Sequence, residues 1–169
     1  MTPAQLTTLR AAVLADPTGA AFFQAPGNAA GLQNYLNSTS TFVAWRAQVS
    51  QDEIMQNGFD WTRVDNLSVG LARVWEWLFA NESKSINPSK ANVRAGIEAV
   101  WKGTAADLAV RAAVYVHCKE LATVAEKMLA SGVGTDANPG LRTFEGEVSP
   151  VEAATLIYKD DGSIWTAGG

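Results

Sequence analysis

The sequence predicts a mainly all-α protein: a compact bundle of about five to six helices, an extended C-terminal arm and a short terminal helix. Helix-starting signals recur along the chain, and apolar residues between them repeat at three- and four-residue spacing. Four of the six tryptophans fall within Val49–Trp101, which we expect to be the centre of the fold or a docking face. We predict a helical body over residues 1–134 and an arm over 135–169.

The first predicted helix begins with a capping box. In Thr2-Pro3-Ala4-Gln5, threonine stands at the N-cap, proline takes the first helical position, and glutamine can reach back to the N-cap amide. We expect this helix to end before Asp16-Pro17. Residues 17–40 predict only short helical turns, with Pro26-Gly27-Asn28 as a turn and Gly31 as a break.

The tryptophan-rich segment predicts further helices. Thr41–Val49 is short and amphipathic, and Ser50-Gln51-Asp52-Glu53 is a second capping box, whose helix is expected to end at Asn57-Gly58. The next helix covers about Leu67–Asn81, with either Asp60 or Asp65-Asn66 available to cap it. Its apolar residues fall on one stripe that includes Trp75, whereas Trp77 points away from that stripe: the stripe is Leu67, Leu71, Val74, Trp75 and Leu78.

The longest predicted helix covers about Ala105–Ala130. It follows a helix that restarts at Asn87-Pro88-Ser89 and stops at Gly103, and Gly132 and Gly134 are expected to close it. A heptad-like seam of mainly small residues would let another helix approach closely. The seam consists of Val110, Val114, Cys118, Leu121, Ala125 and Met128.

Residues 135–169 differ from the body and predict the arm. Leu141–Val148 alternates polar residues with Thr, Phe and Val, the pattern of a short strand or an extended segment. Ser149-Pro150-Val151-Glu152 starts a helix that extends to about Tyr158. Ile164-Trp165, close to the end, indicates a tail that docks either on its own subunit or on a neighbouring one.

Charge and cysteine content narrow the function classes. The chain carries 13 basic and 17 acidic residues, a net charge of −4, and no basic cluster that would neutralise phosphates. Cys118 is the only cysteine, which excludes an intramolecular disulfide framework and favours a reducing compartment. The N-terminus lacks a signal-peptide pattern and no window reaches the roughly 18 apolar residues of a membrane span, so we expect synthesis in a cytoplasm and no membrane.

The sequence predicts no enzyme, metal site or cofactor. His117 and Cys118 are adjacent on the predicted long helix, diverge by about 100° and cannot share a ligand or nucleophile geometry. One histidine and one cysteine cannot build a structural zinc site. Glu145 and Glu147 are interpreted as exposed or interface charges, and the Gly-Val-Gly-Thr run at 132–135 follows a helix instead of opening one, unlike a phosphate loop.

A set of motifs within about residues 40–150 carries a family resemblance. The motifs are Trp45-Arg46, Val49-Ser50-Gln51-Asp52-Glu53-Ile54, Asn57-Gly58-Phe59-Asp60-Trp61, Val64-Asp65-Asn66-Leu67, Arg73-Val74-Trp75-Glu76-Trp77, Ile86-Asn87-Pro88, Val93-Arg94-Ala95-Gly96-Ile97, Trp101-Lys102-Gly103, Ala122-Thr123-Val124-Ala125-Glu126, Gly132-Val133-Gly134-Thr135 and Phe144-Glu145-Gly146. Together they resemble small virion or morphogenesis proteins of tailed bacteriophages. Size, helical content and a C-terminal arm further resemble head-to-tail adaptors, which form a ring below the portal and seal the neck.

The resemblance implies a structural virion protein without catalytic residues, made in the host bacterial cytoplasm. Its expected partners are further copies of itself in a homo-oligomeric ring, for which twelvefold order is one option, the portal protein, and a tail or neck protein. DNA would pass through the ring without specific binding. The alternatives are another phage assembly protein, such as a tail-completion or minor virion component, or a small DNA-packaging or DNA-binding factor.

Exposed aromatic and acidic positions are the candidates for protein contacts. A closed ring repeats one heterologous interface on every subunit, so each subunit needs complementary faces or a tether. Trp77 lacks a basic neighbourhood for stacking bases and is interpreted as an aromatic anchor for a protein partner. The predicted interaction residues are Trp77, Phe144, Glu145, Glu147, Tyr158, Ile164 and Trp165.

Overall fold

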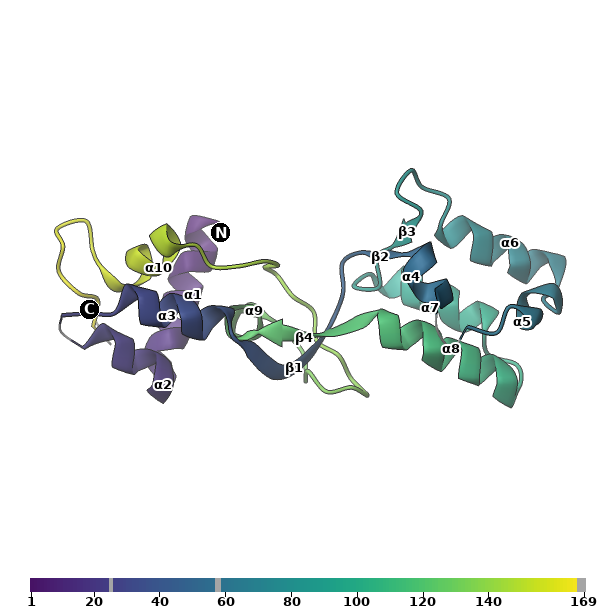
Figure 1. Ribbon diagram of the computed structural model, residues 1–169, viewed down its shortest axis with the longest axis horizontal. Coiled ribbons are helices and arrows are strands. Elements are labelled where there is room, and N and C mark those ends of the chain that lie inside the picture. Colours follow the sequence, from purple (N-terminus) through teal and green to yellow (C-terminus); the bar gives the residue numbers. More distant parts are fainter. Residues whose placement is uncertain (25, 57–58, 167–169) are drawn as a thin grey trace. The chain divides into compact units, whose positions relative to one another are not determined.

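The computed structural model describes residues 1–24, 26–56 and 59–166 (Figure 1). Helix accounts for 53% and strand for 13% of the structure, with ten α-helices and two small antiparallel sheets among the described residues. The predicted all-α bundle is therefore wrong, because the fold is rich in helix but mixes helices with strands. The helix end predicted at Asn57-Gly58 lies outside the described residues.

The chain forms two compact units. Unit 1 comprises Met1–Ala44 and Leu121–Gly169, and unit 2 comprises Trp45–Glu120. The chain leaves unit 1 within strand β1 (Thr39–Trp45) and returns within strand β4 (Lys119–Thr123). The predicted border between a body and an arm, at residue 134, falls inside unit 1.

Residues before and after position 134 together build the core of unit 1. Its helices α9 and α10 both pack against α1 and α3. Four of the eleven buried core residues come after residue 134, so the predicted arm is part of a packed body. The core residues are Leu9, Val13, Phe23, Leu32, Leu36, Ala125, Leu129, Val148, Ala153, Leu156 and Ile157. The elements are α1 (Pro3–Ala15), α2 (Pro17–Ala20), the 3-10 turn η1 (Ala21–Phe23), α3 (Ala29–Asn37), β1 (Thr39–Trp45), β4 (Lys119–Thr123), α9 (Val124–Leu129) and α10 (Pro150–Ile157).

Capping residues set the helix boundaries of unit 1. Thr2 and Ser149 open α1 and α10 with complete capping boxes, as the sequence predicts. Gly31 is not the expected break, because it lies in the first turn of α3. Its backbone N–H donates to the Asn28 side-chain oxygen at 2.8 Å, so asparagine caps that helix.

The helix predicted over Thr41–Val49 is wrong, because most of this segment forms β1. β1 pairs with β4 on one edge. On its other edge, the Val43 N–H donates to the Gly134 carbonyl at 2.8 Å, and the Gly140 N–H donates to the Val43 carbonyl at 2.9 Å. Threonine, phenylalanine, valine and tryptophan fit a pleated surface well, and here they gain partners on both edges.

The long helix predicted over Ala105–Ala130 is also wrong. α8 ends at His117, β4 follows, and α9 begins at Val124. Thr123 and Glu126 form a complete capping box, which starts α9 at a point where the heptad-like seam appeared continuous. The seam residues accordingly separate: Val110, Val114 and Cys118 are buried in unit 2, Leu121 is exposed, and Ala125 and Met128 belong to the core of unit 1.

Three of the five tryptophans of unit 2, Trp45, Trp75 and Trp101, belong to its core. The ring of Trp75 stacks on Phe59 with centroids 5.7 Å apart, and it meets Phe79 and Trp101 edge-on at 5.0 and 5.5 Å. Edge-to-face and offset pairs are favourable for aromatic rings beyond the apolar area that they bury. The elements of unit 2 are β2 (Val49–Ser50), α4 (Gln51–Gln56), α5 (Thr62–Asp65), α6 (Val69–Leu78), β3 (Ser85–Ile86), α7 (Ala91–Val100) and α8 (Ala105–His117).

Helix α6 starts at a residue other than the expected caps. Ser68 accepts a hydrogen bond from the Leu71 N–H at 3.4 Å and is the N-cap. Asp60 instead accepts the N–H of Thr62 at 3.0 Å, at the start of the short helix α5. The serine cap shortens α6 by two residues at its start, relative to the helix expected from Leu67.

Candidate functional site

Helix α6 exposes a stripe that contains the predicted anchor Trp77. Trp75 is 3% exposed and faces the core, whereas Trp77 is 67% exposed on the outer side. Val69, 78% exposed, and the exposed Arg73 precede Trp77 at four-residue spacing. Residues four apart lie on the same helix face, so these three side chains form one outward row, here named the α6 stripe.

The composition of the α6 stripe is typical of a protein contact. Tryptophan and arginine are the residue types most enriched where alanine substitution costs most binding energy. An exposed tryptophan leaves a large apolar area in water, which a partner can cover. Unit 2 holds nine basic and nine acidic residues, so its net charge is zero and no strong field of one sign surrounds the stripe.

A second tryptophan of unit 2 is also exposed. Trp61 is 56% exposed, and its ring meets the buried Phe59 edge-on at 5.3 Å. Phe59 in turn stacks on Trp75. Trp61 therefore extends the aromatic core to the surface, whereas Trp77 has no aromatic partner among the described residues.

The predicted aromatic residues of the arm pack within unit 1. Phe144, Tyr158, Ile164 and Trp165 are partly buried against its core. The backbone N–H of Trp165 donates to the Ile157 carbonyl at 2.9 Å, and the Tyr158 hydroxyl donates to the Pro26 carbonyl at 3.1 Å. Of the two docking alternatives, the structure therefore shows the tail on its own chain.

Two cations flank the ring of Trp165. The Arg10 guanidinium lies 4.1 Å from the ring centroid, and the Lys159 ammonium lies 5.0 Å from it. Arg10 also donates to the carbonyls of Leu156 and Thr155 at 3.1 and 2.8 Å. Cation–π contacts of this kind contribute about 0.5–1 kcal/mol at exposed sites. They fix the tail on α1 and α10.

The two predicted acidic residues lie on the surface of unit 1. Glu145 and Glu147 are both exposed. Arg142 donates to Glu145 at 2.9 Å and also to Glu126 at 3.3 Å. Glu126 is buried and also accepts the Gly146 N–H at 3.2 Å, so the segment that carries the two predicted residues is tied to α9.

The structure thus divides the predicted interaction residues between the units. Six of them belong to unit 1, where the four aromatic or apolar ones are partly buried, and Trp77 belongs to unit 2. Sequence reasoning missed Val69 and Arg73, and Arg73, one turn from Trp77 on the same exposed row, corrects the interpretation that Trp77 lacks a basic neighbour. Their four-residue spacing to Trp77 is the signal that could have identified them.

Cys118 and the backbone of His117 take part in the packing and hydrogen bonding of unit 2. Cys118 is fully buried, and burial raises the pKa of its thiol from 9.0 to about 12. The His117 carbonyl accepts a hydrogen bond from Arg46 at 2.9 Å. Within the described ranges, no group of three His, Cys, Asp or Glu side chains is placed to hold a metal ion, and no helix is both long and apolar enough to cross a membrane.

Comparison of the chain with protein-family models, with curated proteins and with solved structures found no match. The geometry of the two units is therefore the observation that locates a candidate site. It selects the α6 stripe, because this row combines exposure, an aromatic anchor and an arginine on one regular element.

Proposed function

We propose that this protein is a structural component of a tailed-phage neck, a ring-forming head-to-tail adaptor that contacts its partners through the α6 stripe. Two observations support the proposal: the resemblance of the motifs over about residues 40–150, and the exposure of Trp77 on a helix whose opposite face is core. The second carries it, because it supplies a surface for another polypeptide.

The free energy available from Trp77 is substantial. A tryptophan side chain buries roughly 200 Å², so covering its exposed two-thirds at about 25 cal/mol per Å² would contribute about 3 kcal/mol. A ring repeats this contact at every subunit, which multiplies a modest pairwise interaction. Arg73, one turn away, can add a charged hydrogen bond at the edge of the contact.

The charge distribution suits passage of DNA. Unit 1 holds four basic and eight acidic residues, so it carries the whole net charge of −4. Tight nucleic-acid binding requires clustered Lys and Arg that release counterions from phosphates. In the proposed ring, an acidic unit lets DNA move past without holding it.

In this proposal the aromatic residues of the arm do not make the contacts with other proteins that the sequence predicted. Its aromatic residues complete the core of unit 1, so they are already occupied in the single chain. The proposed contact with portal or neighbouring subunits therefore lies on α6. Glu147 stays available at the surface as a secondary, salt-sensitive contact, whereas Glu145 already pairs with Arg142.

The test is assembly of the Trp77→Ser variant with purified portal protein. We expect the wild-type chain to form a multi-subunit complex with portal by light scattering and a ring layer in negative-stain images. Trp77→Ser should weaken this assembly at least tenfold, with a thermal midpoint close to that of the wild type because the side chain lies outside the core. Trp61→Ser, which removes another exposed tryptophan of unit 2, is the control and should leave assembly unchanged. Because it also loses the edge contact with Phe59, its thermal midpoint is measured alongside.

Two results would count against the proposal. Wild-type protein that stays monomeric with portal argues against a neck adaptor, and full assembly of Trp77→Ser argues against the α6 stripe. A complex of defined mass without a ring would favour the alternative of a minor virion component.

A further inference from the structure

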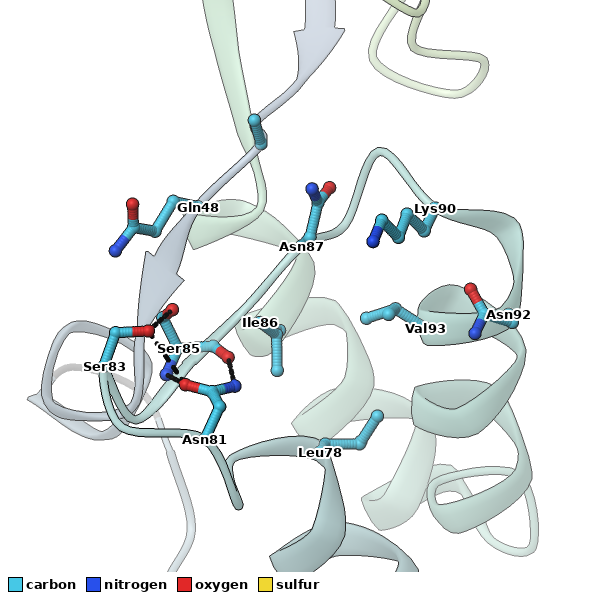
Figure 2. Close-up of a pocket in the computed structure, with 11 residues that line it drawn as sticks. Gln48, Leu78, Asn81, Ser83, Ser85, Ile86, Asn87, Lys90, Asn92 and Val93 are labelled. Atoms are coloured by element: carbon cyan, nitrogen blue, oxygen red, sulfur yellow. Dashed lines mark hydrogen bonds between the residues drawn. The ribbon is translucent and has the colours of Figure 1, made fainter.

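Unit 2 contains a pocket of about 550 Å³ beside strand β3, between the end of α6 and the start of α7 (Figure 2). Its volume falls in the range of roughly 300–1,000 Å³ that is typical of ligand sites. The pocket is separate from the α6 stripe, and nothing in the proposed function uses it.

The pocket has an apolar floor. Leu78 from α6, Ile86 from β3 and Val93 from α7 line it, and Figure 2 shows the ends of these three side chains around one space. Ile86 is 3% exposed and belongs to the core of unit 2, so the partly buried Leu78 and Val93, which pack against that core, supply most of the apolar surface. The floor is therefore a fixed surface onto which a branched aliphatic side chain can pack.

One side of the rim is already ordered by its own hydrogen bonds. The Asn81 amide donates to the Ser85 carbonyl at 2.6 Å and accepts the Ser85 N–H at 3.1 Å, and the Ser83 hydroxyl donates to Asn81 at 2.8 Å. These bonds hold the 81–85 loop, in which Lys84 has a positive φ of 42°. This part of the wall is preformed, and its polar groups are largely used.

The rest of the rim has unused hydrogen-bonding capacity. Within the part of the chain that the structure describes, the side chains of Gln48, Lys90 and Asn92 make no hydrogen bond or ion pair with the protein. Figure 2 shows Lys90 above the apolar floor, near Asn87. Lys90 is the only charged residue among the described lining residues.

We propose that this pocket binds an extended peptide segment in which a branched apolar residue is next to a carboxylate residue. The apolar side chain lies on the floor of Leu78, Ile86 and Val93, and the carboxylate pairs with the Lys90 ammonium. A carboxamide offers one donor group and one acceptor, which complement the C=O and N–H of a peptide bond, so Gln48 and Asn92 hold the backbone.

The test uses the full chain and synthetic peptides. Acetyl-Gly-Leu-Glu-Gly-amide is titrated into labelled protein, and the backbone NMR signals of Asn87, Asn92 and Val93 are followed. Two further peptides separate the contributions: a Leu-Gln version removes the charge, and an Ala-Glu version removes the apolar side chain. We expect binding weaker by about threefold without the charge and by about tenfold without the leucine.

Lys90→Gln tests the site on the protein side. Lys90 is exposed, so its loss leaves the fold intact, and it should abolish the preference for Leu-Glu over Leu-Gln. Lys102→Gln, which removes an exposed cation of unit 2 outside the pocket, should leave that preference unchanged. Absence of shifts at these three residues, equal binding of all three peptides, or an unchanged preference in Lys90→Gln would overturn the proposal. None of these results depends on whether the protein assembles with a portal.

Discussion

Burial changes the acid–base behaviour of two side chains in unit 2. Desolvation raises the pKa of the Cys118 thiol from 9.0 to about 12. Desolvation, followed by the nearby Glu98 carboxylate, also raises the pKa of the Tyr115 hydroxyl above its ordinary value. Both groups are neutral when protonated, and burial disfavours the charged form. In alkali they therefore stay protonated in the folded protein at pH values where they ionise in the unfolded chain.

The Cys118 thiol makes the stability of unit 2 depend on alkaline pH. Above pH 9 the unfolded thiol ionises while the buried one stays protonated up to about pH 12, so stability falls as pH rises through this window. By pH 10.5 this group should cost about 2 kcal/mol relative to pH 8. Urea unfolding of wild type and Cys118→Ala, followed by tryptophan fluorescence, measures the difference.

The Cys118→Ala variant isolates this contribution because both proteins keep Tyr115. The wild type should lose free energy of unfolding between pH 8 and pH 10.5 relative to Cys118→Ala. Any advantage in stability that the wild type has at pH 8 should therefore shrink or reverse at pH 10.5. Parallel stability curves over that range would show that the thiol ionises equally in both states.

Single residues were the most predictable level of this molecule. Trp75 in the core, Trp77 outside it and Cys118 as a small buried side chain all follow from local spacing. The contacts of Trp165 could not be predicted from local spacing. Its partners Arg10 and Lys159 come from distant and adjacent segments, and no local pattern indicates that a guanidinium from the first helix covers this ring.

At the scale of elements, capping signals predicted the starts of α1, α4 and α10 but missed the caps Asn28, Ser68 and Thr123, and periodicity misplaced two strands. β1 and β4 are extended because they pair with each other, and that contact joins segments about 80 residues apart in the sequence. Phe42 shows a similar dependence. Its ring packs where a Cβ at Gly134 or Gly140 would collide, so two distant glycines are needed for this strand to fit.

Thr123 is the local device that separates β4 from α9. Its hydroxyl accepts a hydrogen bond from the Glu126 N–H, and the Glu126 carboxylate accepts one from the Thr123 N–H at 2.8 Å. Thr123→Ala should lower the free energy of unfolding of unit 1 by about 1 kcal/mol, the typical cost of a lost N-cap. Chemical denaturation followed by far-ultraviolet circular dichroism gives the value.

Thr7→Ala is the matched control for the cap. Thr7 lies inside α1, exposed, with its hydroxyl bonded to the Pro3 carbonyl, and alanine is the better helix former there. Its substitution should be neutral or slightly stabilising. If Thr123→Ala is equally neutral, the capping box does not define the start of α9.

At the scale of the whole molecule, the two-unit division makes the C-terminal segment part of a core. The turn-forming composition of residues 135–169 predicts an appendage to the helical body. Composition does not reveal that Val148 and α10 close a core begun by α1 and α3, since that packing joins the two ends of the chain. Because the two end segments of the chain form unit 1 together, unit 2 consists of the single segment between them.

A chain truncated after Gly134 tests whether residues 135–169 are an appendage or part of the core of unit 1. The truncation removes four of the eleven core residues of unit 1, and three of them are large aliphatic side chains worth roughly 1.5–3 kcal/mol each when buried. This loss is comparable with the whole free energy of unfolding of a small unit. We therefore expect unit 1 to unfold, with loss of the helical circular-dichroism signal of α1 and α3, while unit 2 keeps its own core.

The near-ultraviolet spectrum reports separately on unit 2, which holds five of the six tryptophans. This signal should persist in the truncated chain and match that of a fragment of residues 45–120. A truncated chain that keeps its full helical signal would show that residues 135–169 are an appendage after all. Loss of both signals would instead mean that the core of unit 2 requires unit 1, contrary to the independent aromatic packing around Trp75 and Trp101.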